Sequence, residues 1–204
     1  MKLYFTPGTC SLAPHIVIRE LGLPAELRRV RIGLDPIVVA DGRDFRGLNP
    51  LGYVPLLELD DGRLLSEGVA ILQYLADLDP AAGLTPAAGT FARVELHRWL
   101  CFISSELHKS FSPWLFHPEY GEQAAEVART RIASRLALVE RQLADREWLL
   151  GGGFGIADAY LFTIVDWSRA TKVPLDPFPR LAAYLERVRA RASVAEALAH
   201  ERAA

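Results

Sequence analysis

The stretch over residues 79–89 separates two parts of the sequence that have different hydrophobic patterns. It is rich in proline, glycine and alanine, a composition typical of a linker between domains. Before this stretch, short apolar strand patterns alternate with helical periodicity, whereas after it only helical periodicity appears. The sequence therefore predicts an α/β domain over residues 1–79, a linker over residues 80–89 and an all-α domain over residues 90–204.

Turn and capping residues set the boundaries of the predicted elements in the first domain. Asp61-Gly62 predicts a hairpin turn between two strands, and Ser66 predicts the N-cap of the helix that follows. Gly22 and Pro24 predict the end of the first helix. The irregular stretch after the second strand is interpreted as containing a second helix. The predicted elements are a strand over 2–5, a helix over 12–21, a strand over 27–32, this second helix, strands over 56–59 and 63–65, and a helix over 68–78.

In the second domain, apolar residues recur at helical spacing. The predicted helices cover residues 91–117, 119–146, 157–170, 178–192 and 194–202. The apolar stripe of the first of these helices consists of Leu96, Trp99, Leu100, Ile103 and Leu107.

Composition excludes several classes of partner. The chain has 204 residues, 50% of them hydrophobic, which predicts a packed globular protein. A net charge of −2 and a pI near 6.2 make nucleic acid an unexpected partner. No apolar stretch approaches the roughly 20 residues that span a bilayer, so no membrane partner is expected. Two widely separated cysteines and the lack of an apolar leader at the N-terminus predict a cytoplasmic protein.

Cys10 is the first candidate for chemistry. It lies between the first predicted strand and the first predicted helix, where backbone N–H groups and the helix dipole stabilise an anion such as a thiolate. A second cysteine at dithiol spacing is absent from the sequence, so a reacting Cys10 must pair with the sulfur of another molecule. The alternative is a small buried hydrophobic residue.

Two further positions are candidates for holding a ligand. If the bond before Pro55 is cis, the backbone of Val54 would turn outward and could pair with a peptide-like ligand, although an edge-strand proline needs no such function. The helix that opens at Gly68 could bind a ligand carboxylate through its N–H groups while Glu67 accepts from an ammonium group. The alternative there is an ordinary capped helix with an acidic first turn.

The first helix of the second domain carries a polar strip beside its apolar stripe. The strip contains Cys101, Ser104, Ser105 and His108, and Cys101 and His108 are seven residues apart, hence roughly aligned on an α-helix. A single histidine is more often a surface residue than a catalyst. The strip would therefore be functional only if it faced Cys10.

The sequence resembles the beta-class (bacterial, cysteine-containing) glutathione transferases over essentially the whole chain. The resemblance is carried by separate motifs that occur in the same order as in that family. These motifs are Met1 to Leu12, Asn49-Pro50 with Val54-Pro55, Glu67 to Ile71 with Gln73 to Asp77, Ser105 to Lys109, and Ala157 to Phe162. The resemblance implies a thioredoxin-like domain followed by an all-α domain, with glutathione as co-substrate and no metal. It also implies a homodimer, for which Phe102, Glu106 and Lys109 offer a separate helix face.

By position, the resemblance also implies roles for single residues. Cys10 and His108 would lie near the glutathione sulfur, and Val54 would pair with the backbone of glutathione. Glu67 and Gly68 would hold the γ-glutamyl end. The remaining predicted pocket residues are Cys101, Ser105 and Glu106. Asp158 resembles a buried aspartate that helps the helical domain to fold and has no catalytic role.

Three departures from the family pattern stand out. Cys101 replaces an asparagine that contacts the ligand, and a thiol is a weaker hydrogen-bonding group than an amide. The stretch over residues 34–39 contains no counterpart of a lysine that would pair with the glycyl carboxylate of glutathione. Gly155 replaces a serine or threonine cap, with an expected cost on the order of a few tenths of a kcal/mol.

Three functions follow from these patterns. The first is conjugation, in which the glutathione thiolate attacks a small hydrophobic electrophile. The second is a thiol transferase or reductive dehalogenase with Cys10 as the nucleophile, and the third is a binding protein of the same fold without activity. The electrophile site is expected to be apolar, with Phe111, Trp114, Leu115 and Phe116 as candidates.

Overall fold

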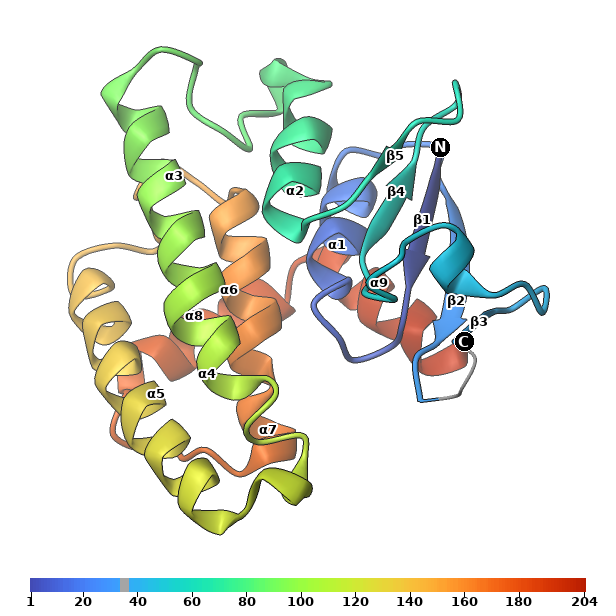
Figure 1. The fold of residues 1–204 in the computed structure, drawn as a ribbon. Coiled ribbons are helices and arrows are strands. Elements are labelled where there is room, and N and C mark those ends of the chain that lie inside the picture. Colours follow the sequence, from blue (N-terminus) through green and yellow to red (C-terminus); the bar gives the residue numbers. More distant parts are fainter. Residues whose placement is uncertain (34–36) are drawn as a thin grey trace. The chain divides into compact units, whose positions relative to one another are not determined.

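The computed structural model describes residues 1–33 and 37–204, which form two compact units (Figure 1). The first unit contains residues 1–82 together with residues 191–204, and the second contains residues 83–190. The predicted α/β domain followed by an all-α domain is confirmed as a fold class. The predicted boundaries differ from these units at the end of the chain, because the last helix packs in the first unit.

The first unit is built on a mixed sheet of five strands in the order β3-β2-β1-β4-β5. Strand β1 pairs in parallel with β2 and antiparallel with β4. The strands are β1 (Lys2–Phe5), β2 (Glu26–Arg31), β3 (Val38–Val39), β4 (Leu56–Glu58) and β5 (Leu64–Leu65). The predicted hairpin between β4 and β5 is confirmed, and Gly62 in its turn has a φ of 84°, which a glycine adopts without strain.

Alternation along β1 sends its side chains to opposite faces of the sheet. The ring of Phe5 lies 5.9 Å from that of His15, in helix α1 (Leu12–Glu20), so this face is covered by α1. The ring of Tyr4 lies 5.7 Å from that of Phe45 on the other face. Helices α2 (Gly68–Asp77) and α9 (Ala192–Ala203) pack beside α1 (Figure 1).

The predicted second helix is wrong for the described part of its stretch. Between β2 and β4, residues 37–53 contain β3 and a single 3-10 turn, Phe45–Gly47. Val39 and Phe45 are buried with Tyr4 in one cluster, and Gly42, with a φ of 87°, turns the chain between them. Apolar residues spaced along a winding chain therefore cover this face without a helix. The missing lysine concerns residues 34–39, and of these only 37–39 are described.

The second unit is helical throughout its described length. Its α-helices are α3 (Phe91–Phe102), α4 (Lys109–Phe111), α5 (Glu122–Gln142), α6 (Ile156–Asp166), α7 (Ser168–Thr171) and α8 (Pro179–Arg189). A π-helical segment, Ile103–His108, joins α3 to α4, and a 3-10 turn, Pro118–Tyr120, precedes α5. The apolar stripe predicted for the first helix is confirmed, because all five of its residues are buried.

The predicted extension of that first helix to residue 117 is wrong. Ser112 has extended backbone angles and precedes Pro113, and a residue before proline is disfavoured in the helical region. The helix therefore ends at Phe111. Residues 112–121 form an irregular stretch before α5 begins at Glu122.

Asp158 fastens the start of α6. One of its carboxylate oxygens accepts from the Leu149 N–H at 2.9 Å and from the Tyr184 hydroxyl at 2.7 Å, and the other accepts from the Gly155 N–H at 2.9 Å. Burial raises the pKa of Asp158 to about 6. A Cβ on Gly155 would lie 2.7 Å from the carbonyl oxygen of Leu84, so a serine cap would collide with the backbone there.

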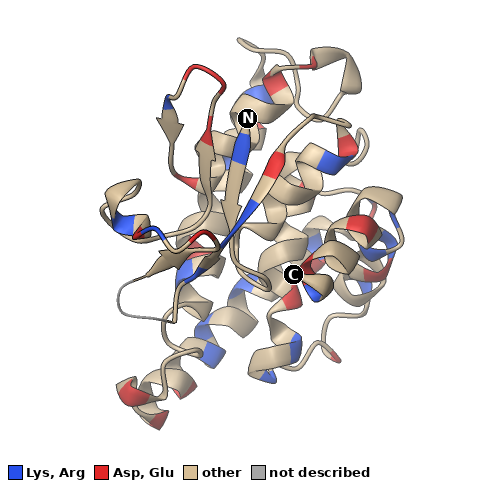
Figure 2. Ribbon diagram, turned by 90° about the vertical axis from the view of Figure 1, so that its right-hand side faces the viewer, with Lys and Arg blue, Asp and Glu red and all other residues tan. Residues whose placement is uncertain are grey.

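Charged residues of both signs are interspersed along the elements (Figure 2). Among the described residues, none of the helices has both the length and the apolar character that a membrane span requires.

Candidate functional site

The predicted site residues fall into two groups, one in each unit. The Cys10 group, in the first unit, consists of Cys10, Val54, Glu67 and Gly68. The His108 group, in the second unit, consists of Cys101, Ser105, Glu106 and His108. Each group is described separately below.

Cys10 lies in the loop that joins β1 to α1, two residues before the helix begins at Leu12. Its side chain is half-buried, and its thiol donates to the carbonyl oxygen of Val54 at 3.3 Å. The structure therefore brings together two residues of the Cys10 group that are far apart in the sequence.

Hydroxyl groups hold the Cys10 loop in shape. The Ser11 hydroxyl accepts from the Thr6 N–H at 3.1 Å, and it lies 2.8 Å from the hydroxyl of Thr9. The Thr9 hydroxyl donates to the Thr6 carbonyl at 2.8 Å. Sequence reasoning did not single out these residues, although threonine and serine before a helix commonly make such local bonds.

Val54 lies at a bend that its neighbours fix. The Val54–Pro55 peptide bond is cis, as the interpretation of the sequence required. The Asn49 side chain donates to the Tyr53 carbonyl at 2.8 Å, and Val54 packs against the cluster around Phe45. The bend is thus held by a hydrogen bond at Tyr53 and by apolar packing of the Val54 side chain.

Glu67 has an uncommon backbone conformation, with a φ of 69° and a ψ of 111°. A non-glycine residue at such a φ is strained, and strain of this kind is concentrated at functional sites. Glu67, and not the predicted Ser66, is the N-cap of α2, because the Glu67 carbonyl accepts the first helical bond from Ile71 at 3.0 Å. The Glu67 side chain is exposed and makes no capping bond, and Gly68 follows as the first helical residue.

The His108 group lies on α3 and the π-helical segment that follows it. Cys101 is exposed at the end of α3, and its carbonyl accepts from the hydroxyls of Ser105 at 2.8 Å and Ser104 at 3.0 Å. A π-helix has more residues per turn than an α-helix, so the spacing of seven no longer aligns Cys101 with His108. Such segments are frequent at functional sites.

His108 is packed among aromatic rings of its own unit. Its Nδ1 lies 2.9 Å from the Tyr160 hydroxyl, and its ring lies 5.0 Å from that of Trp167. Burial, with a smaller contribution from Lys109, lowers the pKa of His108 to about 4. The imidazole is therefore neutral near pH 7, with one nitrogen that donates and one that accepts. Tyr160 and Trp167 were missed because the fold alone brings them to His108.

Glu106 has partners within its own unit. Its carboxylate lies 2.7 Å from the guanidinium of Arg135 and 3.1 Å from that of Arg131, both in α5. Arg135, and then Arg131, lower the pKa of Glu106 below its ordinary value. A ligand that used Glu106 would have to share it with these two cations.

The residues predicted for the electrophile site divide into core and surface. Phe111 is fully buried in the core of the second unit, and Leu115 is half-buried. Trp114 and Phe116 are exposed. The ring of Phe116 lies 5.2 Å from that of Trp167, which also touches His108. A cluster of aromatic rings therefore runs from His108 through the buried Trp167 to the exposed Phe116.

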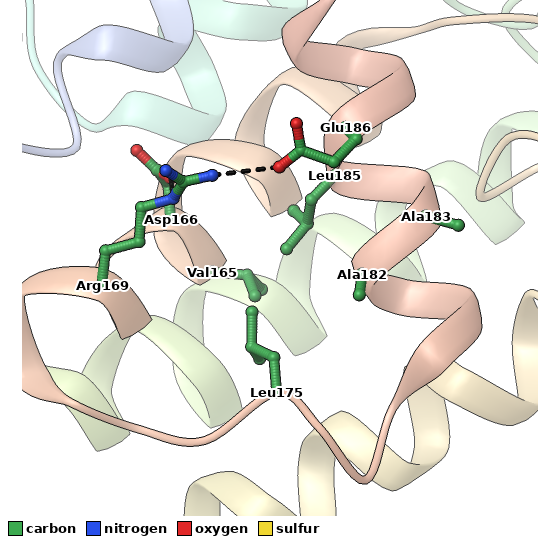
Figure 3. Close-up of a pocket in the computed structure, with 8 residues that line it drawn as sticks. All are labelled: Val165, Asp166, Arg169, Leu175, Ala182, Ala183, Leu185 and Glu186. Atoms are coloured by element: carbon green, nitrogen blue, oxygen red, sulfur yellow. Dashed lines mark hydrogen bonds and ion pairs between the residues drawn. The ribbon is translucent and has the colours of Figure 1, made fainter.

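A pocket of about 280 Å³ lies elsewhere in the second unit, between α6, α7 and α8 (Figure 3). Its lining is formed by Val165, Asp166, Arg169, Leu175, Ala182, Ala183, Leu185 and Glu186. Arg169 and Glu186 form an ion pair of 3.0 Å there. None of the predicted site residues is among those eight, and the lining offers no thiol or imidazole for sulfur chemistry.

Two family models match the chain. The model described as "Glutathione S-transferase, N-terminal domain" matches residues 8–78, and the model described as "Glutathione S-transferase, C-terminal domain" matches residues 95–192. Together they include every residue of the Cys10 group and of the His108 group.

Individual relatives are similar over the whole chain. Glutathione S-transferase GstA of Escherichia coli O157:H7 is 42% identical, over 98% of this chain and 98% of the relative. The solved structure of a sphingomonad glutathione S-transferase complexed with glutathione is 40% identical, with a TM-score of 0.94 and coverage of 100% of both chains. A bacterial beta-class glutathione S-transferase of Sphingomonas chungbukensis is 41% identical, with a TM-score of 0.93 and coverage of 98% of each chain.

Proposed function

Because the chain belongs to the glutathione S-transferase family, we propose that it joins the sulfur of glutathione to a small hydrophobic electrophile. The chain is a glutathione transferase, and glutathione is its co-substrate. In the conjugation step, the glutathione thiolate forms a carbon–sulfur bond, the leaving group departs with its electron pair, and the thiol proton passes to solvent.

The contact between Cys10 and Val54 supports glutathione as the source of the nucleophile. The sulfur of Cys10 lies 3.3 Å from the Val54 carbonyl oxygen, a distance at which the protonated thiol donates to that oxygen. A thiolate, which is the reactive form of cysteine, could not make this bond. In this proposal Cys10 lies near the start of α1 and makes a polarizable contact with the glutathione sulfur.

The rest of the Cys10 group holds the ends and backbone of glutathione in this proposal. The Val54 N–H and carbonyl pair with the peptide backbone of glutathione. The N–H groups at the start of α2, beginning with Gly68, bind the γ-glutamyl carboxylate, because the N-terminus of a helix attracts anions. The exposed Glu67 carboxylate accepts from the γ-glutamyl ammonium, and its strained backbone directs it toward the ligand.

In the second unit, we assign the main role to His108. If the Tyr160 hydroxyl donates to Nδ1 across their 2.9 Å separation, Nε2 carries the proton and can donate to the glutathione sulfur. Because the pKa of His108 is lowered to about 4, the imidazole is neutral and keeps this Nε2–H donor at every pH well above 4. We also assign Ser105, Cys101 and Glu106 to the binding of glutathione. The exposed ring of Phe116, which packs against Trp167, is assigned to the binding of the electrophile.

Thiol exchange is the second candidate, because Cys10 lies where an incoming sulfur could reach it. Its thiolate would attack a mixed disulfide of glutathione, form a disulfide between Cys10 and glutathione, and release the other thiol. A second glutathione thiolate would then regenerate Cys10 and release oxidised glutathione. In this cycle the protein sulfur is consumed and restored in each turnover.

Substitution of each cysteine separates the two reactions. We expect Cys10→Ala to retain conjugation of an aryl halide and to lose reduction of a mixed disulfide of glutathione. Cys101→Ala should keep both activities, and the double variant shows whether the exposed Cys101 thiol replaces Cys10. Loss of both activities in a folded Cys10→Ala variant with normal glutathione binding would contradict this division of roles.

We also propose a homodimer in a reducing compartment such as the cytoplasm. Phe91 and Val94 on α3 are large apolar residues with exposed fractions of 77% and 56%, which a partner subunit would cover. Cys10 and Cys101 are not joined in a disulfide, which is compatible with such a compartment. A monomeric mass by light scattering at micromolar concentration would contradict the dimer.

A further inference from the structure

The last helix of the chain carries a buried carboxylate that reaches the Cys10 loop. Glu201 in α9 has an exposed fraction of only 7%, which is unusual for a glutamate. Its Oε2 accepts from the backbone N–H of Gly8 at 2.9 Å. Gly8 lies two residues before Cys10 and has a φ of 74°, so this bond holds the loop where its backbone takes a left-handed conformation.

The second oxygen of the same carboxylate has its own partner. Glu201 Oε1 lies 3.3 Å from Nδ1 of His15, a fully buried residue of α1. The Arg19 guanidinium donates to Nε2 of His15 at 3.4 Å. Because Nε2 accepts, Nδ1 carries the proton and donates to Glu201. A chain of hydrogen bonds thus leads from Arg19 through His15 and Glu201 to Gly8.

The other end of α9 is attached through a different carboxylate. Glu20, at the end of α1, accepts from the Arg191 guanidinium and from the Ser193 hydroxyl. This attachment joins α9 to α1 without touching the Cys10 loop. Glu20 and Glu201 therefore both attach α9 to the rest of the first unit. Of the hydrogen bonds described for these two residues, only that of Glu201 to Gly8 reaches the Cys10 loop.

We infer that Glu201 is a positioning residue for Cys10. By fixing the Gly8 N–H, it keeps the Cys10 loop in the conformation in which the thiol rests against the Val54 carbonyl. A buried carboxylate with hydrogen-bond donors on both oxygens is geometrically well defined, which is why it can set the path of a loop. The consequence for glutathione binding rests on the role of Cys10 proposed above.

The test compares Glu201→Gln with Glu20→Gln in the full-length protein. Each change removes one charge and one acceptor from an attachment of α9, but only the first removes an acceptor from the Cys10 loop or from the histidine that supports it. The readout is the rate of alkylation by iodoacetamide at Cys10, followed by mass spectrometry of peptides. Cys101, exposed in the other unit, is the internal reference.

We expect Glu201→Gln to raise the alkylation rate of Cys10 about fivefold, the change that corresponds to loss of one hydrogen bond. Release of the loop exposes a thiol that is otherwise half-buried and bonded. Cys101 should react at an unchanged rate. The KM for glutathione should rise by a similar factor with kcat nearly unchanged, and Glu20→Gln should leave the rate and KM as in the wild type.

Equal effects of Glu20→Gln and Glu201→Gln would overturn the inference, because they would show that docking of α9 alone matters. An unchanged or slower reaction of Cys10 in Glu201→Gln would overturn it as well. If Cys10 reacts faster but KM is unchanged, Glu201 still positions the loop, and the proposed role of Cys10 in binding glutathione fails instead. Should Glu201→Gln not fold, Glu201→Asp, which withdraws the carboxylate by one methylene group, has the same expected outcomes.

Discussion

The Cys10 group lies on three loops or turns, whereas the His108 group lies on one continuous helical element, α3 and the π-helical segment that follows it. Cys10, Val54 and Glu67 each lie outside regular structure or at its edge. Side-chain hydrogen bonds of neighbouring residues hold the backbone around Cys10 and Val54. His108 lies on the π-helical segment after α3, and rings packed around it define its position. The first group depends on hydrogen bonds between side chains and backbone, and the second depends on packing.

This difference predicts different sensitivities. A loop held by one or two hydrogen bonds can be released without unfolding its unit, so changes near Cys10 should alter reactivity more than stability. A side chain held by core packing moves only when the core moves, so changes around His108 should alter both. All four tryptophans of the chain lie in the second unit, so their fluorescence reports on that unit.

The largest effect is expected from Asp158→Ala. It leaves the Leu149 N–H, the Gly155 N–H and the Tyr184 hydroxyl without their acceptor in the core, which should cost roughly 3 to 5 kcal/mol. Urea denaturation followed by tryptophan fluorescence measures this loss. Asp145→Ala, which removes an exposed ion pair with Arg146, should cost about 0.5 kcal/mol or less.

The loss in Asp158→Ala should also depend on pH. Burial raises the pKa of Asp158 in the folded protein to about 6, above its ordinary value of 3.8. Its contribution to stability is therefore complete below pH 3.8 and declines as the pH rises through 6. The difference between wild type and variant should be larger at pH 5 than at pH 8, and the reverse order would contradict this account of Asp158.

The next effect concerns catalysis by the His108 group. His108→Ala should lower kcat by roughly 100-fold, as for loss of one donor to a developing anion, with little change in the KM for glutathione. Tyr160→Phe, which removes only the partner of Nδ1, should lower kcat by roughly tenfold. His117→Ala is the control, since that histidine is exposed and pairs with Glu119. An unchanged kcat in His108→Ala would remove His108 from the mechanism.

Gly155→Ser tests packing at the start of α6. Its Cβ would meet the Leu84 carbonyl oxygen at 2.7 Å, so we expect a loss of roughly 1 to 3 kcal/mol despite the capping hydroxyl. Gly152→Ser is a matched control, because a Cβ there has no neighbour within 4 Å. A stabilised Gly155→Ser variant would mean that the hydroxyl cap outweighs the collision.

The smallest effect on stability is expected from Glu67→Gly. Removing the side chain at a φ of 69° relieves strain, so the variant should be more stable by about 1 kcal/mol while its KM for glutathione rises. Lys172→Gly, at a φ of 56° in the second unit, should gain similar stability without a change in KM. Circular dichroism in urea measures both. A Glu67→Gly variant with normal KM would place Glu67 outside the glutathione site.

Features with local causes were predicted well. The strand over residues 2–5, the Asp61-Gly62 hairpin and the apolar stripe of α3 follow from side-chain periodicity and turn chemistry over a few residues. The errors at Ser66 and at the end of the first long helix were also local. The first arose because Glu67 has a positive φ, which a glutamate rarely adopts. The second arose because Pro113 disfavours helical backbone angles at Ser112.

The partners of the site residues could not be predicted in the same way. Tyr160 reaches His108 across 52 positions, and Glu201 reaches Gly8 across 193 positions. Periodicity placed Glu201 on a helix but gave no reason to bury it. The π-helical segment was equally hidden, because its sequence has the same apolar spacing as an α-helix.

The sequence by itself determined the succession of an α/β part and a helical part, the candidate thiol and imidazole, and the family to which they belong. These depend on residue types and on spacings within a turn or two of chain, where backbone geometry is nearly fixed. The tertiary structure alone decided that α9 joins the first unit, that Glu106 pairs with Arg135 and that Glu201 supports the Cys10 loop. A buried polar group takes whichever partner the packing of distant elements brings within reach, and no local pattern encodes that choice.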